Sequence, residues 1–189
     1  MLIFATTPSQ TVGPYFAIGL PWGEGPFAVP EDTPEAIRIC GVVYDGAATP
    51  VPDALIETWQ ADSDGRFADL HGYGESSEIP GFRGFARFGA EDGDGGFEIV
   101  TVKPGPVPGL AGAMQAPHID VSVFARGMLH RCVTRIYFAD EPEANGRDPV
   151  LARVPSERRA TLLAEPAPDG GYMFDIHLQG PDETVFFEL

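Results

Sequence analysis

Two side chains that can bind a metal stand two positions apart in the stretch APHIDVSVFAR, at His118 and Asp120. The surrounding residues alternate between apolar and polar, which is typical of a β-strand, and alternate side chains of a strand point to the same face. An imidazole and a carboxylate would therefore lie side by side, next to the proline- and glycine-rich stretch TVKPGPVPGL. This pair is the first candidate for chemistry in the chain.

A third ligand for the same metal could come from His177. Two histidines and one carboxylate, here in the order His118, Asp120 and His177, form the facial triad of ferrous oxygenases. An oxygenase of the 2-oxoglutarate type would also need an anion-binding arginine shortly after the second histidine, and none follows His177. The sequence favours a surface or hydrogen-bonded role for this histidine, and the triad is the weaker alternative.

The motif D-x-D-G-x-F occurs twice, at residues 62–67 and 92–97. Calcium loops of the EF-hand type need glycine at the sixth position and glutamate at the twelfth. Here the glycine is fourth, and the twelfth positions hold Tyr73 and Lys103. The sequence instead predicts acidic turns, in which the aspartate side chains accept hydrogen bonds from backbone N–H groups.

The charge and cysteine content of the chain restrict its partners and its compartment. Its 12 basic and 28 acidic residues give a formal net charge of −16. Such a surface repels nucleic acid and anionic membranes, and any site for an anionic small molecule must concentrate arginine locally. No run approaches the roughly 18 apolar residues of a membrane span, and we expect no signal peptide. Cys40 and Cys132 lie in apolar strand-like runs, so free thiols and a cytoplasmic location are expected rather than a disulfide.

Turn residues and short alternating runs predict an all-β protein. The 189 residues, of which 23 are glycine and 19 are proline, suit one well-buried domain with many turns. We expect a β-sandwich of about eight strands with one short helix at about 155–164. The expected strands include the runs 37–45, 54–62, 96–103, 118–126, 130–139, 171–180 and 183–189.

Two segments show no such pattern. Residues 68–90 are expected to form a loop-rich insert. Residues 1–35 contain turn chemistry and aromatic residues without a helix or strand period, and a long arm of this kind is unusual inside a compact domain. We therefore expect an N-terminal arm over 1–35, packing on a partner subunit, and the sandwich over 36–189.

Several longer motifs together resemble one enzyme family. The segments TPSQTVGPYF, DALIETWQADSDGRF, TVKPGP, APHIDVSVFARG and ETVFFEL are similar to those of the intradiol ring-cleaving dioxygenases, from about residue 7 to the C-terminus. The resemblance implies a β-sandwich in an enzyme that uses ferric iron and O₂. It also implies cleavage of protocatechuate (3,4-dihydroxybenzoate) between its two hydroxyl-bearing carbons.

The resemblance further indicates where iron ligands would lie. Members of the family bind ferric iron through two tyrosines and two histidines, and the matching positions here hold Phe67, Val107, His118 and Asp120. Three of the four ligands are replaced, and phenylalanine and valine offer no donor atom. The resemblance therefore implies no metal in this chain. It places Fe(3+) in a partner β subunit of the same fold, as in heteromeric members of the family.

In such heteromers the working site lies between the two subunits. The resemblance implies that Thr11, Gly13, Pro14 and Tyr15 of the arm line the substrate pocket on the partner. It also implies that Arg126 reaches the bound catechol, since a guanidinium holds an anionic oxygen through planar, charge-assisted hydrogen bonds. It assigns no catalytic residue to this chain.

Two other interpretations stay open at this point. Arg126 could be an ordinary arginine at the end of a strand. The whole chain could also be a free-standing binding or scaffold module, which uses the sandwich without any shared active site.

Overall fold

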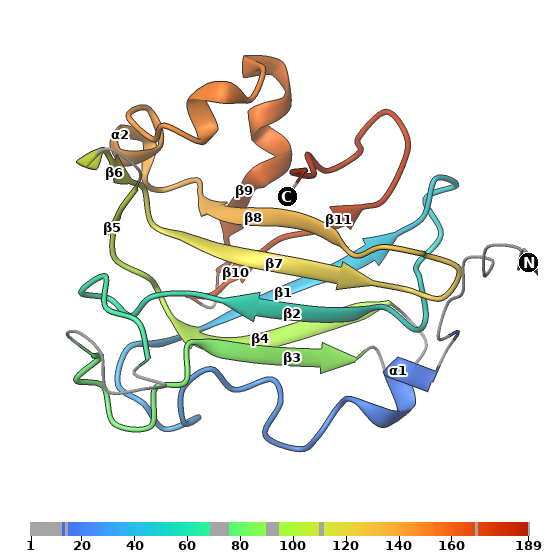
Figure 1. Ribbon diagram of the computed structural model, residues 1–189, viewed down its shortest axis with the longest axis horizontal. Coiled ribbons are helices and arrows are strands. Elements are labelled where there is room, and N and C mark those ends of the chain that lie inside the picture. Colours follow the sequence, from blue (N-terminus) through green and yellow to red (C-terminus); the bar gives the residue numbers. More distant parts are fainter. Residues whose placement is uncertain are drawn as a thin grey trace, which may run out of the picture.

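The computed structural model describes residues 13, 15–68, 76–89, 95–109, 112–168 and 170–188 of the chain. Two layers of strands pack face to face (Figure 1). The front layer is antiparallel and has the order β3 (Phe85–Gly89), β2 (Leu55–Trp59), β7 (His118–Phe124) and β8 (Cys132–Phe138). The back layer contains β4 (Gly96–Val102), β1 (Ala36–Tyr44), β10 (Tyr172–Met173) and β11 (Ile176–His177).

One strand joins the two layers. β9 (Leu163–Pro166) runs parallel to β8 and antiparallel to β10, so backbone hydrogen bonds continue from the front layer into the back layer. A separate hairpin of β5 (Val107–Pro108) and β6 (Met114–Gln115) lies at the end where β7 begins (Figure 1). The helical segments are α1 (Tyr15–Gly19), α2 (Pro142–Asn145), η2 (Leu151–Arg153) and η3 (Ser156–Leu162).

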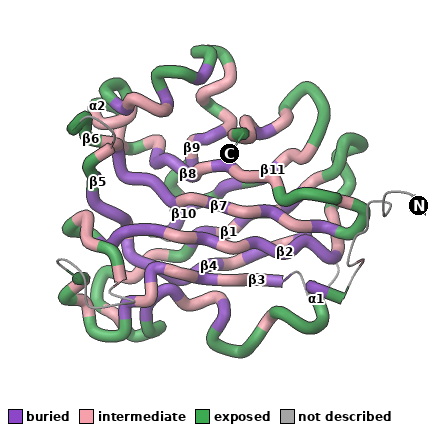
Figure 2. Tube along the Cα trace, in the orientation of Figure 1, coloured by how far each residue is buried: buried purple, intermediate pink, exposed green. Residues whose placement is uncertain are grey.

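Strand alternation decides which side chains fill the core and which face outward. In β7, Ile119, Val121 and Val123 are buried in the core between the layers. Because successive side chains point to opposite faces, His118 and Asp120 lie on the outer face of the front layer. Figure 2 shows buried and partly buried positions alternating along the strands of this layer.

The predicted all-β sandwich is confirmed, with eleven strands in the described residues where about eight were expected. β3 lies in the segment 68–90 that was expected to be loop, and β9 was not predicted. The C-terminal run forms no strand over 183–188, although its backbone donates a hydrogen bond from Phe187 N to Val133 O (2.8 Å). The helix expected at 155–164 is a 3₁₀ helix over Ser156–Leu162.

Part of the N-terminal segment belongs to the core of the sandwich. Phe27 forms a β-bridge with Val100 of β4, and Ala28 and Val29 are buried. The side chain of Arg83 donates a hydrogen bond from Nε to the backbone oxygen of Phe27 (3.0 Å). The domain boundary expected at residue 35 stays a prediction, and the structure adds that residues 27–29 already contribute to the core.

Two smaller expectations concern the cysteines and the membrane. Cys40 and Cys132 are not joined to one another by a disulfide. In the ranges that the structure describes, no helix combines the length and the apolar character that crossing a membrane requires.

Candidate functional site at the outer face of the front layer

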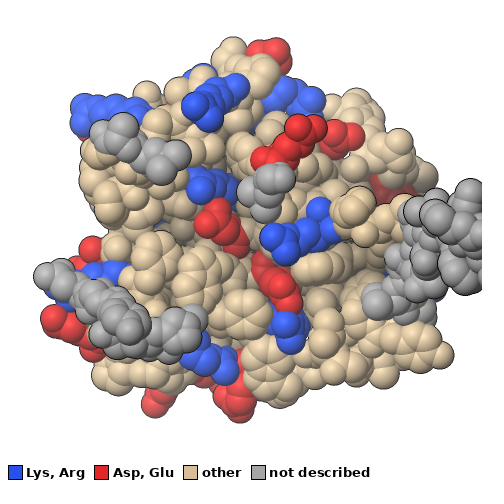
Figure 3. Space-filling view, viewed as in Figure 1, with Lys and Arg blue, Asp and Glu red and all other residues tan. Residues whose placement is uncertain are grey.

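The outer face of the front layer carries charges paired between neighbouring strands. The strand register places Glu57 opposite Arg87, and Asp120 opposite Arg135. The nitrogen–oxygen distances in these two ion pairs are 2.6 Å and 2.8 Å. Figure 3 shows basic and acidic side chains alternating across this face. Arginine is therefore concentrated here, but each of these two guanidinium groups already has a carboxylate partner.

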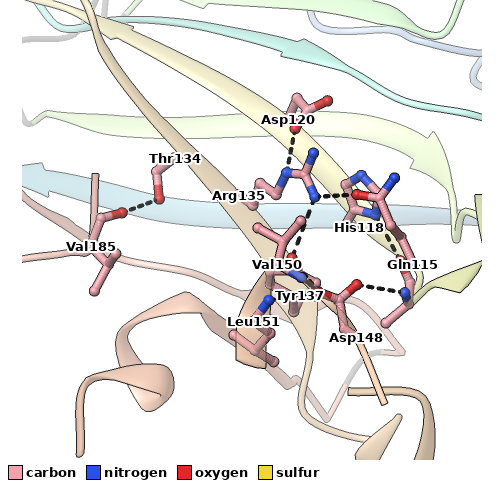
Figure 4. A network of polar contacts seen from close by, with 11 residues as sticks. Gln115, His118, Asp120, Thr134, Arg135, Tyr137, Asp148, Val150, Leu151 and Val185 are labelled. Atoms are coloured by element: carbon pink, nitrogen blue, oxygen red, sulfur yellow. Dashed lines mark hydrogen bonds and ion pairs between the residues drawn. The ribbon is translucent and has the colours of Figure 1, made fainter. Parts of the chain in front are cut away.

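Arg135 is the centre of a polar network at the start of β7 (Figure 4). Its Nε donates to Asp120 Oδ1 at 2.8 Å, and its Nη1 donates to Gln115 Oε1 at 2.7 Å. Nη1 also lies 3.5 Å from the hydroxyl of Tyr137. Burial alone would lower the pKa of Arg135, but the Asp120 carboxylate and the Tyr137 hydroxyl together outweigh burial and raise this pKa. Strands β6, β7 and β8 thus meet around one permanent positive charge.

Asp148 is a buried carboxylate that holds the chain immediately before β7. Its Oδ2 accepts the backbone N–H of Ala116 at 2.8 Å. Its Oδ1 accepts the backbone N–H groups of Val150 (2.8 Å) and Leu151 (2.6 Å), and the hydroxyl of Tyr137 (3.2 Å). Four donors thus compensate for the hydration that the buried carboxylate lacks.

His118 lies between these two sets of contacts. Its Nδ1 is 2.7 Å from the carbonyl oxygen of Ala116. A carbonyl only accepts hydrogen bonds, so Nδ1 carries the proton and Nε2 keeps its lone pair. Burial, followed by the positive charge of Arg135, lowers the pKa of His118 below its ordinary value. The structure therefore favours the neutral imidazole.

His177 is separated from this site. It lies in β11 of the back layer, and its ring stacks on Tyr44 with the centroids 4.9 Å apart. His118 and Asp120 lie on the outer face of the other layer. Over the described ranges, no three side chains of His, Cys, Asp or Glu gather as a metal site would require. The structure does not bring the facial triad together.

The first acidic turn has the predicted structure. The Oδ1 atom of Asp62 accepts two backbone N–H groups, two and four residues later, at 2.9 Å and 2.8 Å. Gly65 has a φ of 78°, and a Cβ there would lie 2.4 Å from the carbonyl oxygen of Pro106. This close approach requires glycine, and it brings together the loops that carry Phe67 and Val107.

The arm residues expected in a partner's pocket are described only in part. Gly13 has a φ of 64°, a left-handed conformation that favours glycine. Tyr15 begins α1 and is 75% exposed, and Ile18 of the same helix is 76% exposed. Thr11 and Pro14 lie outside the described residues. The helix thus offers apolar side chains to solvent, as a segment that packs on another protein does.

A cation–π contact fixes the arm to the front layer just after α1. The guanidinium of Arg87 lies 5.2 Å from the ring centroid of Trp22 and 5.5 Å from that of Phe85. Its Nη1 also donates to the backbone oxygen of Leu20 at 3.2 Å. The same guanidinium is paired with Glu57 and is therefore held in place on β3. Its contacts with Trp22 and Leu20 thus fix the position of this part of the arm against β3.

Arg126 follows the end of β7, and 58% of its side chain is exposed. Its Nε lies 3.5 Å from Oδ1 of Asp53, a residue that precedes β2 and is buried. Sequence reasoning did not single out Asp53. The sequence could have indicated it by position, because Asp53 directly precedes the predicted strand 54–62 and so places a carboxylate at the start of a strand.

A family model described as Dioxygenase matches residues 11–180 of the chain. The chain belongs to this dioxygenase family. It is 45% identical over 204 residues to the protocatechuate 3,4-dioxygenase alpha chain of Burkholderia cepacia, with 100% of each chain covered. It is 32% identical to the protocatechuate 3,4-dioxygenase beta chain of the same organism, over 79% of this chain and 67% of the beta chain.

A solved structure of the family shows the same fold. The 3-chlorocatechol 1,2-dioxygenase of Rhodococcus opacus aligns with a TM-score of 0.61 and 20% sequence identity, over 90% of this chain and 70% of that chain. The resemblance to intradiol dioxygenases that the sequence motifs indicated is therefore confirmed, both by sequence and by fold.

The residues of this dioxygenase at the four ligand positions of the family do not fit a ferric ion. Phe67 stacks on Trp59 with the centroids 6.1 Å apart, and Val107 is buried, so two positions offer only hydrocarbon. Asp120 is already neutralised by Arg135. His118 keeps a lone pair at Nε2, but the neighbouring guanidinium would repel a second cation.

The sequence alone gives no partner for Arg135. The structure shows that it bonds to Asp120 across the β7–β8 pair. The signal was present in the alternation, because both residues were expected on strands, and both face outward if those strands are neighbours. The missing information was the register between the strands.

Proposed function

We propose that this chain is the alpha-type subunit of a heteromeric protocatechuate 3,4-dioxygenase. The assembled enzyme would cleave protocatechuate between its two hydroxyl-bearing carbons and incorporate both atoms of O₂, giving 3-carboxy-cis,cis-muconate. The observation that carries the proposal is the 45% identity over the full length of a protein named as the alpha chain of this enzyme. The residues at the four ligand positions do not fit iron, which supports the assignment of this chain to the subunit that does not bind the metal.

The proposal places the iron in a partner β subunit of the same fold. The 32% identity to a beta chain of the same enzyme supports two subunits that share one architecture. Ferric iron bound in the partner would supply Lewis-acid activation of the catechol. No metal is assigned to the present chain, where a guanidinium already balances Asp120.

The role of this chain would be to position the substrate and to exclude water from the partner's site. The arm would lie over that site, with Thr11, Gly13, Pro14 and Tyr15 lining the pocket. Arg126 would bind an anionic oxygen of the substrate. On a chain with a net charge of −16, an accessible guanidinium would offset locally the repulsion of an anionic substrate.

The proposal also includes a cytoplasmic location. Cys40 and Cys132 are not joined by a disulfide, which suits a reducing compartment, where disulfides rarely form.

The proposal is tested by comparing the purified chain with its complex. The chain alone should contain no stoichiometric iron and should show no O₂ consumption with protocatechuate. The chain purified together with an iron-bearing β subunit should turn protocatechuate over. Tightly bound ferric iron and activity in the isolated chain would contradict the proposal. Full activity of the β subunit in the absence of this chain would favour the scaffold interpretation instead.

A further inference from the structure

Asp53 is a buried carboxylate without the donors that such a group normally has. Its exposed fraction is 8%, and no donor in the described residues forms a hydrogen bond with either carboxylate oxygen. Buried polar groups are nearly always hydrogen-bonded, because leaving water without compensation is costly. The contact that the structure gives Asp53 is the ion pair with Arg126, in which Nε and Oδ1 are 3.5 Å apart.

The strand register explains why these two residues meet. Leu55 of β2 lies opposite Phe124 of β7 in an antiparallel pair. Asp53 lies two residues before Leu55, and Arg126 lies two residues after Phe124, so both residues lie just beyond the same end of this strand pair. This placement brings the two side chains within reach of one another, and the structure joins them in the ion pair.

The side of the guanidinium that Asp53 contacts decides what Arg126 can still bind. Asp53 meets it at Nε, and within the described residues nothing bonds to the two terminal amino groups. An arginine can bind a planar anion through two parallel N–H groups. The Asp53 carboxylate at Nε orients the guanidinium of Arg126. Because 58% of the side chain is exposed, the terminal amino groups are still accessible to a ligand.

We propose that Asp53 is the positioning residue that orients Arg126 toward an anionic oxygen of the substrate bound on the partner subunit. The inference rests on the proposed function. Asp53 does not touch the substrate in this arrangement and acts through Arg126. Since no other donor among the described residues bonds to its carboxylate, the pair orders both residues together.

The test uses the assembled enzyme, made of this chain and an iron-bearing β subunit, with O₂ consumption measured against protocatechuate concentration. Asp53→Asn keeps the shape of the side chain and removes its charge. We expect the KM for protocatechuate to rise about 3- to 10-fold while kcat stays within about twofold, because orientation for binding is lost and the partner's chemistry is untouched. Glu98→Gln is the matched control. Glu98 also pairs with an arginine, Arg38, on the back layer, so both constants should stay unchanged.

A double-mutant cycle separates the inference from the proposed function. Arg126→Ala should raise KM by about 10-fold or more. Adding Asp53→Asn should raise it no further, because both changes act through one guanidinium. An unchanged KM in Arg126→Ala would overturn the proposed role of Arg126 itself.

Two outcomes would overturn the positioning inference alone. The first is a raised KM in Arg126→Ala together with an unchanged KM in Asp53→Asn. The second is that the two effects add in full. A purely structural role of Asp53 would lower the yield of the complex without this separation of KM from kcat. Asp53→Ser, which is smaller and also uncharged, provides the same measurement if the asparagine variant does not assemble.

Discussion

Replacing Arg135 by methionine tests whether one guanidinium holds together the corner where β6, β7 and β8 meet. Methionine keeps much of the aliphatic stem, so the change removes chiefly a charge and its donors. The bond to Asp120 contributes about 1 kcal/mol, because that carboxylate is 43% exposed and water can replace the arginine. The bond to Gln115, from a largely buried charged donor, contributes about 1.5 kcal/mol. Removing a buried charge offsets part of this sum, so the free energy of unfolding should fall by about 2 kcal/mol.

Thermal unfolding of the isolated chain, followed by circular dichroism, measures this loss. For a domain of this length, the expected fall in Tm is about 4–8 °C. Arg38→Met is the matched control, because Arg38 pairs with Glu31 and Glu98 but is exposed on the back layer. Its Tm should stay close to that of the wild type. If Arg135→Met lowers Tm no more than this control does, the reasoning about the network is wrong.

The pairing of Arg135 with Asp120 can be checked separately. Asp120→Asn in the Arg135→Met background should change Tm little, because the ion pair is already broken. A large additional loss of Tm would show that Asp120 stabilises the chain through other contacts.

Three further predictions concern Asp148, His118 and the clamp on the arm. Asp148→Asn should lower the free energy of unfolding, measured by urea denaturation, by about 3 kcal/mol. The reason is that an amide nitrogen would face the backbone N–H of Ala116. A loss below about 1 kcal/mol would contradict the assigned contacts. The pKa of His118 is lowered from its ordinary value of 6.5, so protonation favours the unfolded chain and stability should fall as the pH drops below 6.5. His118→Gln should reduce that dependence of Tm on pH, and an unchanged dependence would assign the effect to other groups. Arg87→Ala should free Trp22 and speed limited proteolysis of the segment around it, whereas unchanged cleavage would show that the clamp does not hold the arm.

The sequence predicts the front layer well where alternation is strong, as in His118–Phe124 and Cys132–Phe138. It does not predict β3, because the short run FARFG follows a glycine-rich stretch and becomes a strand by pairing with β2. The run ETVFFEL is rich in strand-forming residues, yet over 183–188 it forms no strand. Pairing partners, which sequence does not reveal, override local preference in both cases.

The candidate site was predicted from residue types and missed where it depends on register or burial. His118 and Asp120 were found because imidazole and carboxylate are recognisable ligands. Arg135 was missed because its partner becomes visible only when β7 and β8 are aligned. Asp53 and Asp148 precede or follow regular elements, and nothing in a sequence tells a buried aspartate from one that caps an exposed turn.

The anchoring of residues 27–29 in the sandwich determines how much of the N-terminal segment can be cut away. An N-terminal truncation that makes the chain begin at residue 36 would remove Ala28 and Val29 and uncover apolar neighbours such as Val102. A truncation that makes the chain begin at residue 26 would leave this anchor in place. The protein that begins at residue 36 is expected to fail to fold. The protein that begins at residue 26 is expected to fold but to fail to recognise its partner. Under the proposed function, folding and partner recognition would be encoded in adjacent but separable stretches, and sequence drift before residue 26 would change recognition while the sandwich persists.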